Sequence, residues 1–227
     1  MGLGGRLRHS RYVIWDWNGT LLDDMWLTLR VTNSLLADRG LSLLDRETYR
    51  EVFGFPLVDY YRRIGLDLDK ESFKELSREW NLLYETEREG CSLFLGIGNL
   101  IESLWLDGWG QCVVSAYEEK KLKELIGFHG LCRFFSEICG LDNDEGFGKI
   151  ELGLKFVENF YQKIDLDTTV YVGDTVHDAE VARAMKVECL LVSYGHQSRR
   201  RLEATGFNVV NNTKELFNKL QSWQKES

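Results

Sequence analysis

Residues 12–23 have the sequence YVIWDWNGTLLD. The run from Tyr12 to Trp15 is apolar and rich in β-forming residues, and it stops at Asp16. Residues 18–20, Asn-Gly-Thr, are typical of a turn. We therefore expect a buried strand that places an aspartate at its carboxyl end, followed by a polar loop.

The rest of the chain divides into two patterns. From Asp24 to about Tyr84, apolar residues recur at helical spacing and no convincing strand intervenes, which predicts a small helical bundle. After Gly90, short apolar runs alternate with helical stretches, which is typical of parallel βαβ units. The expected strands are 111–114, 170–172 and 190–192, and the expected helices are 99–106, 120–126, 151–164, 178–185 and 213–223. The predicted fold class is α/β, with a Rossmann-like parallel-sheet core (1–23 and 91–227) and an inserted all-helical domain (24–90).

Composition narrows the range of functions. The chain has 227 residues, 44% of them hydrophobic, and a formal net charge of −8. This excludes bulk disorder and argues against nucleic acid or an anionic membrane as partner. No apolar run approaches the ~18 residues of a membrane helix, and residues 1–11 lack the apolar core of a signal peptide. The five cysteines show no C-x-x-C spacing, which favours reduced thiols. We expect a cytoplasmic protein, and none of these features predicts an oligomeric state.

Polar residues gather where the predicted strands end. Asp16 ends the first strand, Ser115 the second, and Asp174 and Asp178 follow the third, while Lys149 precedes a helix. Ligands of parallel sheets bind at the carboxyl ends of the strands, so these side chains should meet at one edge. Clustered carboxylates repel one another, and a Mg²⁺ ion, which prefers oxygen ligands, would relieve that repulsion.

These motifs resemble the haloacid dehalogenase-like hydrolase superfamily, most closely its phosphoglycolate phosphatase-like members with a helical cap of the C1 type. The family's first motif, D-x-D-G-T-L-x-D, is matched by residues 16–23 except at one position. Its second motif, a strand ending in Ser or Thr, is matched at Ser115, and its third, a lysine before a helix, at Lys149. The fourth, G-D-x-x-x-D, is matched by residues 173–178. The resemblance implies that residues 24–90 form the cap.

The resemblance also implies roles for these residues. Asp16 would be the nucleophile that forms an aspartyl-phosphate, and Ser115 and Lys149 would hold the phosphoryl oxygens. The implied substrate-binding residues are Gly19, Thr20, Ser115, Ala116 and Lys149. The implied Mg²⁺ ligands are Asp16, the main-chain carbonyl of Asn18, Asp174 and Asp178. The implied function is a Mg²⁺-dependent phosphatase, a phosphoric monoester hydrolase, acting on a small phosphorylated metabolite.

Asn18 is the departure from the family pattern, which has at this position an aspartate that works as general acid and base. An asparagine donates hydrogen bonds but transfers no proton, and general acid–base catalysis contributes roughly 10²–10⁴ in rate. Three hypotheses follow. The substrate has a good leaving group, as in an acyl phosphate or a phosphoanhydride; or another group, such as His177, supplies the proton; or the chain is a catalytically weak protein that binds a phosphate ligand or a partner. A phosphonate-cleaving enzyme is a weaker option, since the available lysines, Lys70 and Lys74, look exposed.

The insert should exclude water from the site and contact the leaving group. Residues 54–56, Gly-Phe-Pro, resemble the family's cap segment near the substrate. Arg62 and Arg63 are interpreted as surface residues in preference to an anion-binding pair. Trp17 is expected to shape the pocket entrance. The aromatic residues expected in the core of the insert are Trp26, Tyr60, Tyr61 and Trp80.

Overall fold

The computed structural model describes residues 11–143, 146, 148–160 and 164–223. Its centre is a six-stranded sheet in the order β5-β4-β1-β6-β7-β8, and every neighbouring pair is parallel. The strands are β1 (Tyr12–Trp15), β4 (Gly110–Glu118), β5 (Glu137–Leu141), β6 (Thr169–Gly173), β7 (Glu188–Val192) and β8 (Asn208–Val210). The expected α/β fold with a parallel sheet is confirmed.

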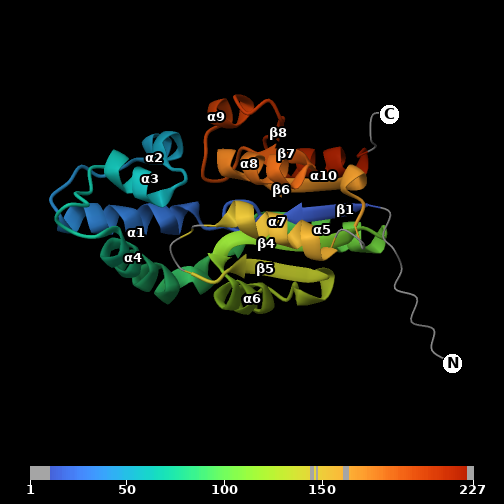
Figure 1. The fold of residues 1–227 in the computed structure, drawn as a ribbon, viewed down its shortest axis with the longest axis horizontal. Helices are drawn as coiled ribbons and strands as arrows, with labels where there is room; N and C mark the ends of the chain where they lie inside the picture. The colour runs from blue at the N-terminus through green and yellow to red at the C-terminus, as the bar shows by residue number, and fades with distance from the viewer. Residues whose placement is uncertain (1–10, 144–145, 147, 161–163, 224–227) are drawn as a thin grey trace.

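Helices cover both faces of this sheet (Figure 1). Side chains of a strand alternate between the faces, so Val13 and Trp15 join one apolar cluster while Tyr12 and Ile14 join the other. The helices that pack on the first face are α5 (Ile97–Leu106), α6 (Glu119–Phe128) and α10 (Thr213–Gln221). Those on the second are α7 (Lys149–Phe160), α8 (Val176–Met185) and α9 (Arg199–Glu203). Because both faces are covered, the central strands are fully buried.

Four of the five α-helices between β1 and β4 form a separate group. A two-stranded antiparallel ribbon, β2 (Leu22–Asp23) and β3 (Ser92–Leu93), lies at the two ends of this segment. Between the ribbon strands lie α1 (Met25–Asp38), α2 (Arg46–Val52), α3 (Leu57–Arg63) and α4 (Phe73–Glu87). We call residues 24–90 the helical insert. Figure 1 shows it beyond the edge to which the arrows of the parallel strands point.

The helical insert has an apolar cluster of its own. Leu36, Tyr49, Tyr60 and Leu76 are among its buried members, and each is at most 2% exposed. A Ser72–Glu75 capping box begins α4, and Asp45 caps α2. These local signals explain why the segment folds as helices without a strand.

The helical insert is tied to the loop that follows β7. Arg50 of α2 donates to the carbonyls of Ser193 and Gln197. Conversely, the side chains of Gln197, in the same loop, and Arg201, in α9, donate to the carbonyl of Phe53. These contacts place α2 directly over that loop.

Several elements differ from the sequence-based expectations. Strand β4 continues past Ser115 to Glu118, with a shift in its pairing to β5 between Val114 and Glu118. Strands β5 and β8 were not predicted, because these edge strands are partly exposed and lack a long apolar run. Three short 3₁₀ turns, 88–90, 132–134 and 166–168, complete the described elements. Among the described residues, no helix is long and apolar enough to cross a membrane.

Candidate active site

The loop after β1 brings its backbone close to the loop after β6. Gly19 adopts a φ of +74°, and a Cβ there would lie 2.3 Å from Oδ2 of Asp174 and 2.3 Å from Cδ2 of His196. Only glycine fits this approach. The Thr20 hydroxyl lies 3.3 Å from Asp16 Oδ2 and 3.2 Å from Asp174 Oδ1, so it bridges the two loops.

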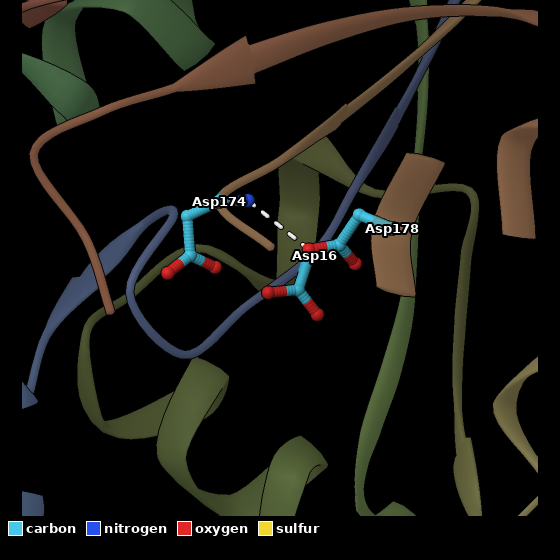
Figure 2. Close-up of side chains that lie close together, drawn as sticks. All are labelled: Asp16, Asp174 and Asp178. Carbon is cyan, nitrogen blue, oxygen red and sulfur yellow. Dashed lines mark hydrogen bonds between the residues drawn. The ribbon is translucent and has the colours of Figure 1, made fainter. Parts of the chain in front are cut away.

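Three buried carboxylates converge at the edge of the sheet (Figure 2). Asp16 follows β1, Asp174 follows β6, and Asp178 lies in the first turn of α8. One oxygen from each can be chosen such that all three lie within 4.8 Å of one another. The predicted meeting of these carboxylates is therefore present in the structure.

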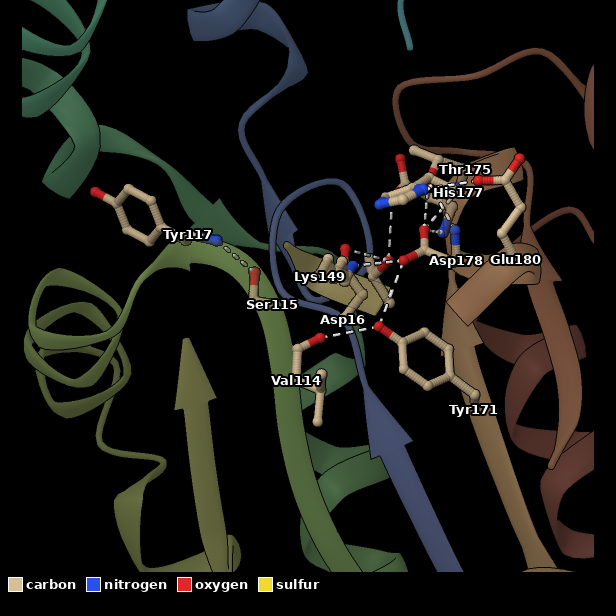
Figure 3. A network of polar contacts seen from close by, with 12 residues as sticks. Asp16, Val114, Ser115, Tyr117, Lys149, Tyr171, Thr175, His177, Asp178 and Glu180 are labelled. Carbon is tan, nitrogen blue, oxygen red and sulfur yellow. Dashed lines mark hydrogen bonds and ion pairs between the residues drawn. The ribbon is translucent and has the colours of Figure 1, made fainter. Parts of the chain in front are cut away.

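Lys149 forms ion pairs with two of the three carboxylates. Its Nζ lies 2.6 Å from Asp16 Oδ1 and 2.5 Å from Asp178 Oδ1, and Figure 3 traces both contacts. Burial alone would lower the pKa of Lys149, but Asp16 and Asp178 outweigh it and raise that pKa well above its usual value. The lysine is therefore charged and fixed between its partners.

The carboxylate oxygens of Asp178 are already occupied by protein donors. Oδ2 accepts from the backbone N–H groups of Asp174 and Thr175 and from the Thr175 hydroxyl, and Oδ1 accepts from Lys149 and Tyr171. Despite burial, Lys149 and Thr175 hold the pKa of Asp178 below its usual value. Asp178 thus fixes the position of Lys149 and of the first turn of α8.

The charge on Asp16 and Asp174 is less well compensated. Burial raises the pKa of Asp16 to about 6, against the attraction of Lys149. Burial raises the pKa of Asp174 to about 8, and the neighbouring carboxylates Asp178 and Asp16 add to the rise. A hard divalent cation prefers anionic oxygen ligands and would offset this excess negative charge. The residues present therefore fit such an ion, with Asp16 and Asp174 as its most available donors.

Asn18 belongs to a hydrogen-bonded cluster at the base of the helical insert. Its Nδ2 donates to Asp24 Oδ2 at 2.8 Å and to the hydroxyl of Tyr84 at 2.8 Å. Tyr84, from α4, donates in turn to Asp24 Oδ2. Both amide N–H groups of Asn18 are therefore used within the protein.

His196 connects the carboxylate cluster to the helical insert. Its backbone N–H donates to Asp174 Oδ2 at 2.6 Å, and its Nε2 lies 3.1 Å from Asp24 Oδ1. Its Nδ1 lies 2.7 Å from the hydroxyl of Tyr49 in α2. Although burial opposes the charged form, Asp24 raises the pKa of His196 to about 9. The ring is thus a charged link with both nitrogens engaged.

A pocket of about 130 Å³ opens onto the carboxylate cluster. Of the catalytic, substrate-binding and metal-binding residues expected from the sequence, those that line it are Asp16, Asn18, Ser115, Ala116, Lys149, Asp174 and Asp178. Gly19 and Thr20 do not line the pocket, because they lie buried beneath it and position Asp174. Phe55, Leu57 and Trp80 form its wall on the side of the helical insert.

Other expectations need correction. Trp17 does not shape the entrance, because its side chain is fully buried in the core. Trp80 lines the pocket instead of lying only in the core, and Trp26 is 45% exposed. His177, the candidate proton donor, pairs with Glu180 and stacks on Phe55, and its side chain is 16% exposed.

Sequence reasoning missed Asp24, Tyr84 and His196 as residues of the site. Asp24 directly follows the first motif, and the signal available in the sequence was a second acidic residue next to Asp23. Tyr84 and His196 carry no motif, and only the fold brings them to Asp24.

The model of the family described as haloacid dehalogenase-like hydrolase matches residues 13–192. The chain belongs to this family. It is 25% identical to the probable phosphatase IndB of Dickeya dadantii over 206 residues, covering 88% of the chain and 89% of that protein. It is 24% identical over 220 residues to a phosphoglycolate phosphatase of Pseudomonas fluorescens, covering 94% and 80% respectively.

The fold of this haloacid dehalogenase-like hydrolase is also found in solved structures. A predicted phosphatase from Clostridium acetobutylicum superposes with a TM-score of 0.80 at 21% identity, covering 94% of this chain and 99% of that one. At this identity the match establishes a shared fold, and the chemistry must be argued from the site.

Proposed function

We propose that this hydrolase is a Mg²⁺-dependent phosphatase acting on a small phosphorylated metabolite. The observation that carries the proposal is the buried cluster of Asp16, Asp174 and Asp178 with Lys149 between two of its members. The relatives named phosphatases support the same reaction class.

Asp16 is the proposed nucleophile. One of its carboxylate oxygens attacks phosphorus, the bond from phosphorus to the leaving oxygen breaks, and water then hydrolyses the aspartyl-phosphate to release phosphate. Lys149 holds Asp16 in place and stabilises the charge of the phosphoryl oxygens. Ser115, which lines the pocket, would donate a hydrogen bond to the same oxygens.

The proposed ligands of Mg²⁺ are Asp16, Asp174 and the carbonyl of Asn18, with Asp178 supporting the site. When bound, the ion would screen the carboxylates from the substrate phosphate and stabilise charge on the transferring group. Thr20 and the backbone N–H of His196 orient Asp174 for this role.

We also propose that the core (1–23 and 91–227) and the helical insert (24–90) are two domains, with the insert as a cap over the pocket. The separate apolar cluster of the insert supports the division. The five free thiols support a reducing, cytoplasmic location, and the acidic charge argues against nucleic acid as partner.

A second candidate function is a catalytically weak protein that binds a phosphate ligand or a partner. Asn18 supports it, because its position holds no group that can transfer a proton. The intact carboxylates and Lys149 favour the enzyme.

The test is phosphate release from a panel of phosphorylated metabolites, with Mg²⁺ and with EDTA. We expect Mg²⁺-dependent turnover that Asp16→Asn abolishes, while the exposed control Asp69→Asn keeps it. Mg²⁺ binding without turnover of any compound would favour the second candidate.

A further inference from the structure

A small cavity inside the helical insert adjoins the active-site pocket. It has a volume of about 80 Å³ and shares Thr28, Phe53, Leu57, Trp80 and Asn81 with that pocket. Since the two spaces have common walls, a leaving group attached to the phosphate would extend from one into the other. We call this space the insert cavity.

The insert cavity is apolar with hydroxyl groups at its far side. Tyr60 is 2% exposed and Ser77 is 4% exposed, and neither hydroxyl makes a hydrogen bond of normal geometry within the described residues. The Tyr60 hydroxyl interacts weakly with that of Thr32, and the Ser77 hydroxyl with that of Tyr61. Because these four residues line the insert cavity and not the active-site pocket, their hydroxyls lie on the side away from that pocket.

Among the described residues that line the two spaces, no cationic side chain is available to a second anionic group. The cationic side chains among them are Lys149 and His196. Lys149 is held by Asp16 and Asp178, and His196 by Asp24. A carboxylate on the leaving group would be buried unpaired beside acidic side chains, which is strongly unfavourable. The part of the leaving group beyond its leaving oxygen should therefore carry no second charge.

Within the part of the chain that the structure describes, Asn18 and His196 offer the leaving oxygen no unengaged N–H group. Both N–H groups of Asn18 are bonded to Asp24 and Tyr84, and both ring nitrogens of His196 are engaged. An alkoxide would leave slowly from such a site. A carboxylate leaves without protonation, because its conjugate acid is strong.

Size limits the leaving group further. A cavity of ~150 Å³ encloses a benzene ring, so a space about half as large suits roughly three carbons and excludes a nucleoside. On the basis of the proposed phosphatase function, we infer that the substrate is a short-chain acyl phosphate with an uncharged tail. Attack by Asp16 breaks the P–O bond, the acyl group leaves as its carboxylate, and water then releases phosphate from Asp16.

The experiment compares initial rates with Mg²⁺, corrected for spontaneous hydrolysis, for acetyl phosphate, butyryl phosphate, n-butyl phosphate and phosphoglycolate. We expect kcat/KM for butyryl phosphate to exceed that for n-butyl phosphate by about 10²-fold or more, because only the ester needs a proton donor. Phosphoglycolate should be poorer than butyryl phosphate by at least about tenfold. Equal or faster turnover of phosphoglycolate or n-butyl phosphate would overturn the inference and leave the phosphatase proposal standing. No turnover of these four compounds would also overturn the inference, while turnover of another compound in the metabolite panel would still support the proposed phosphatase.

A second arm tests the insert cavity itself. Ser77→Leu should lower the ratio of kcat/KM for butyryl phosphate to that for acetyl phosphate by about tenfold, because leucine fills the cavity. The matched control on the same helix, exposed Thr86→Leu, should keep the ratio. Leu57→Arg should instead raise the ratio of phosphoglycolate to butyryl phosphate by supplying a cation, which keeps the test decisive if Ser77→Leu does not fold. Unchanged ratios in folded Ser77→Leu and Leu57→Arg would contradict the placement of the leaving group in the insert cavity.

An outer groove offers the competing location for a leaving group. It is lined by Lys74, Arg78 and Lys121 and shares Asn81 with the pocket. If Arg78→Ala lowered kcat/KM for phosphoglycolate or butyryl phosphate more than tenfold, the leaving group would lie in this groove and the inference would be wrong.

Discussion

The side-chain amide of Asn18 donates a hydrogen bond of 2.8 Å to the carboxylate of Asp24. An aspartate at position 18 would put two carboxylate oxygens at that separation within a buried cluster. One of them would have to be protonated or displaced. The amide at position 18 and the acid at position 24 are therefore a matched pair.

We predict that Asn18→Asp alone destabilises the protein by about 2 kcal/mol, because of this repulsion. The exchange variant Asn18→Asp/Asp24→Asn should recover most of that loss, since it restores one acid and one amide. Urea unfolding of the two single variants and the double variant measures the coupling. Additive losses would show that the two side chains do not interact.

The same exchange should raise turnover of alkyl phosphates. It returns a carboxyl group to the position where the family has its acid and base, an effect worth roughly 10²–10⁴ in rate. We expect kcat for n-butyl phosphate to rise at least tenfold in the double variant. If kcat stays unchanged while the protein is folded and binds Mg²⁺, the missing proton donor is not what limits the ester reaction.

Replacing Lys149 should affect stability and activity together. Lys149→Met leaves Asp16 and Asp178 buried without their cation, which costs about 3–5 kcal/mol. Urea unfolding should show this loss, and phosphate release should stop. Lys155→Met, an exposed position on the same helix, is the matched control and should change neither property. A stable Lys149→Met protein would contradict the proposed charge balance.

Mg²⁺ should stabilise the folded protein through Asp174. At about 100 times its Kd, a ligand that binds only the native state adds about 2.7 kcal/mol, or roughly 5–10 °C in Tm for a chain of this size. Thermal unfolding with and without Mg²⁺ should show this rise in the wild type and in Asp69→Asn. Asp174→Asn should lose it. An equal rise in Asp174→Asn would place the ion elsewhere.

Gly195 should tolerate no side chain. A Cβ there would lie 2.3 Å from both Asp174 Oδ2 and the Gly19 carbonyl. Gly195→Ala should therefore displace Asp174, lower stability by about 2 kcal/mol and weaken the Tm response to Mg²⁺. Gly98→Ala, in α5 with open space around it, is the control and should be neutral or stabilising. A full Mg²⁺ response in Gly195→Ala would contradict the tight approach of these loops.

The central fold could be predicted from the sequence because its signals are local. Residues 12–15 form an apolar run that ends at Asp16, and that run is β1. The meeting of Asp16 with Asp174 followed from the rule that parallel strands end at one edge. Strand β5 escaped prediction because its exposed edge removes the need for an apolar run.

The partners of Asn18 could not be predicted in the same way. Tyr84 lies 66 residues away from Asn18 in the sequence, and nothing in its surroundings marks it. Likewise, Trp80 follows the helical periodicity of a core residue although it faces the pocket. Periodicity tells which face of a helix is buried, but not whether protein or substrate covers it.

His196 couples the carboxylate cluster to the helical insert. Its backbone N–H contacts Asp174 while its ring contacts Asp24 and Tyr49, so one residue contacts both the proposed metal ligand and α2. Whatever moves α2 must also alter the donor that orients Asp174. Ion affinity and the position of the helices then form linked equilibria, and linkage is reciprocal. We expect the ion to bind more tightly when substrate holds the helices in place, so that the reaction centre becomes complete only around its substrate.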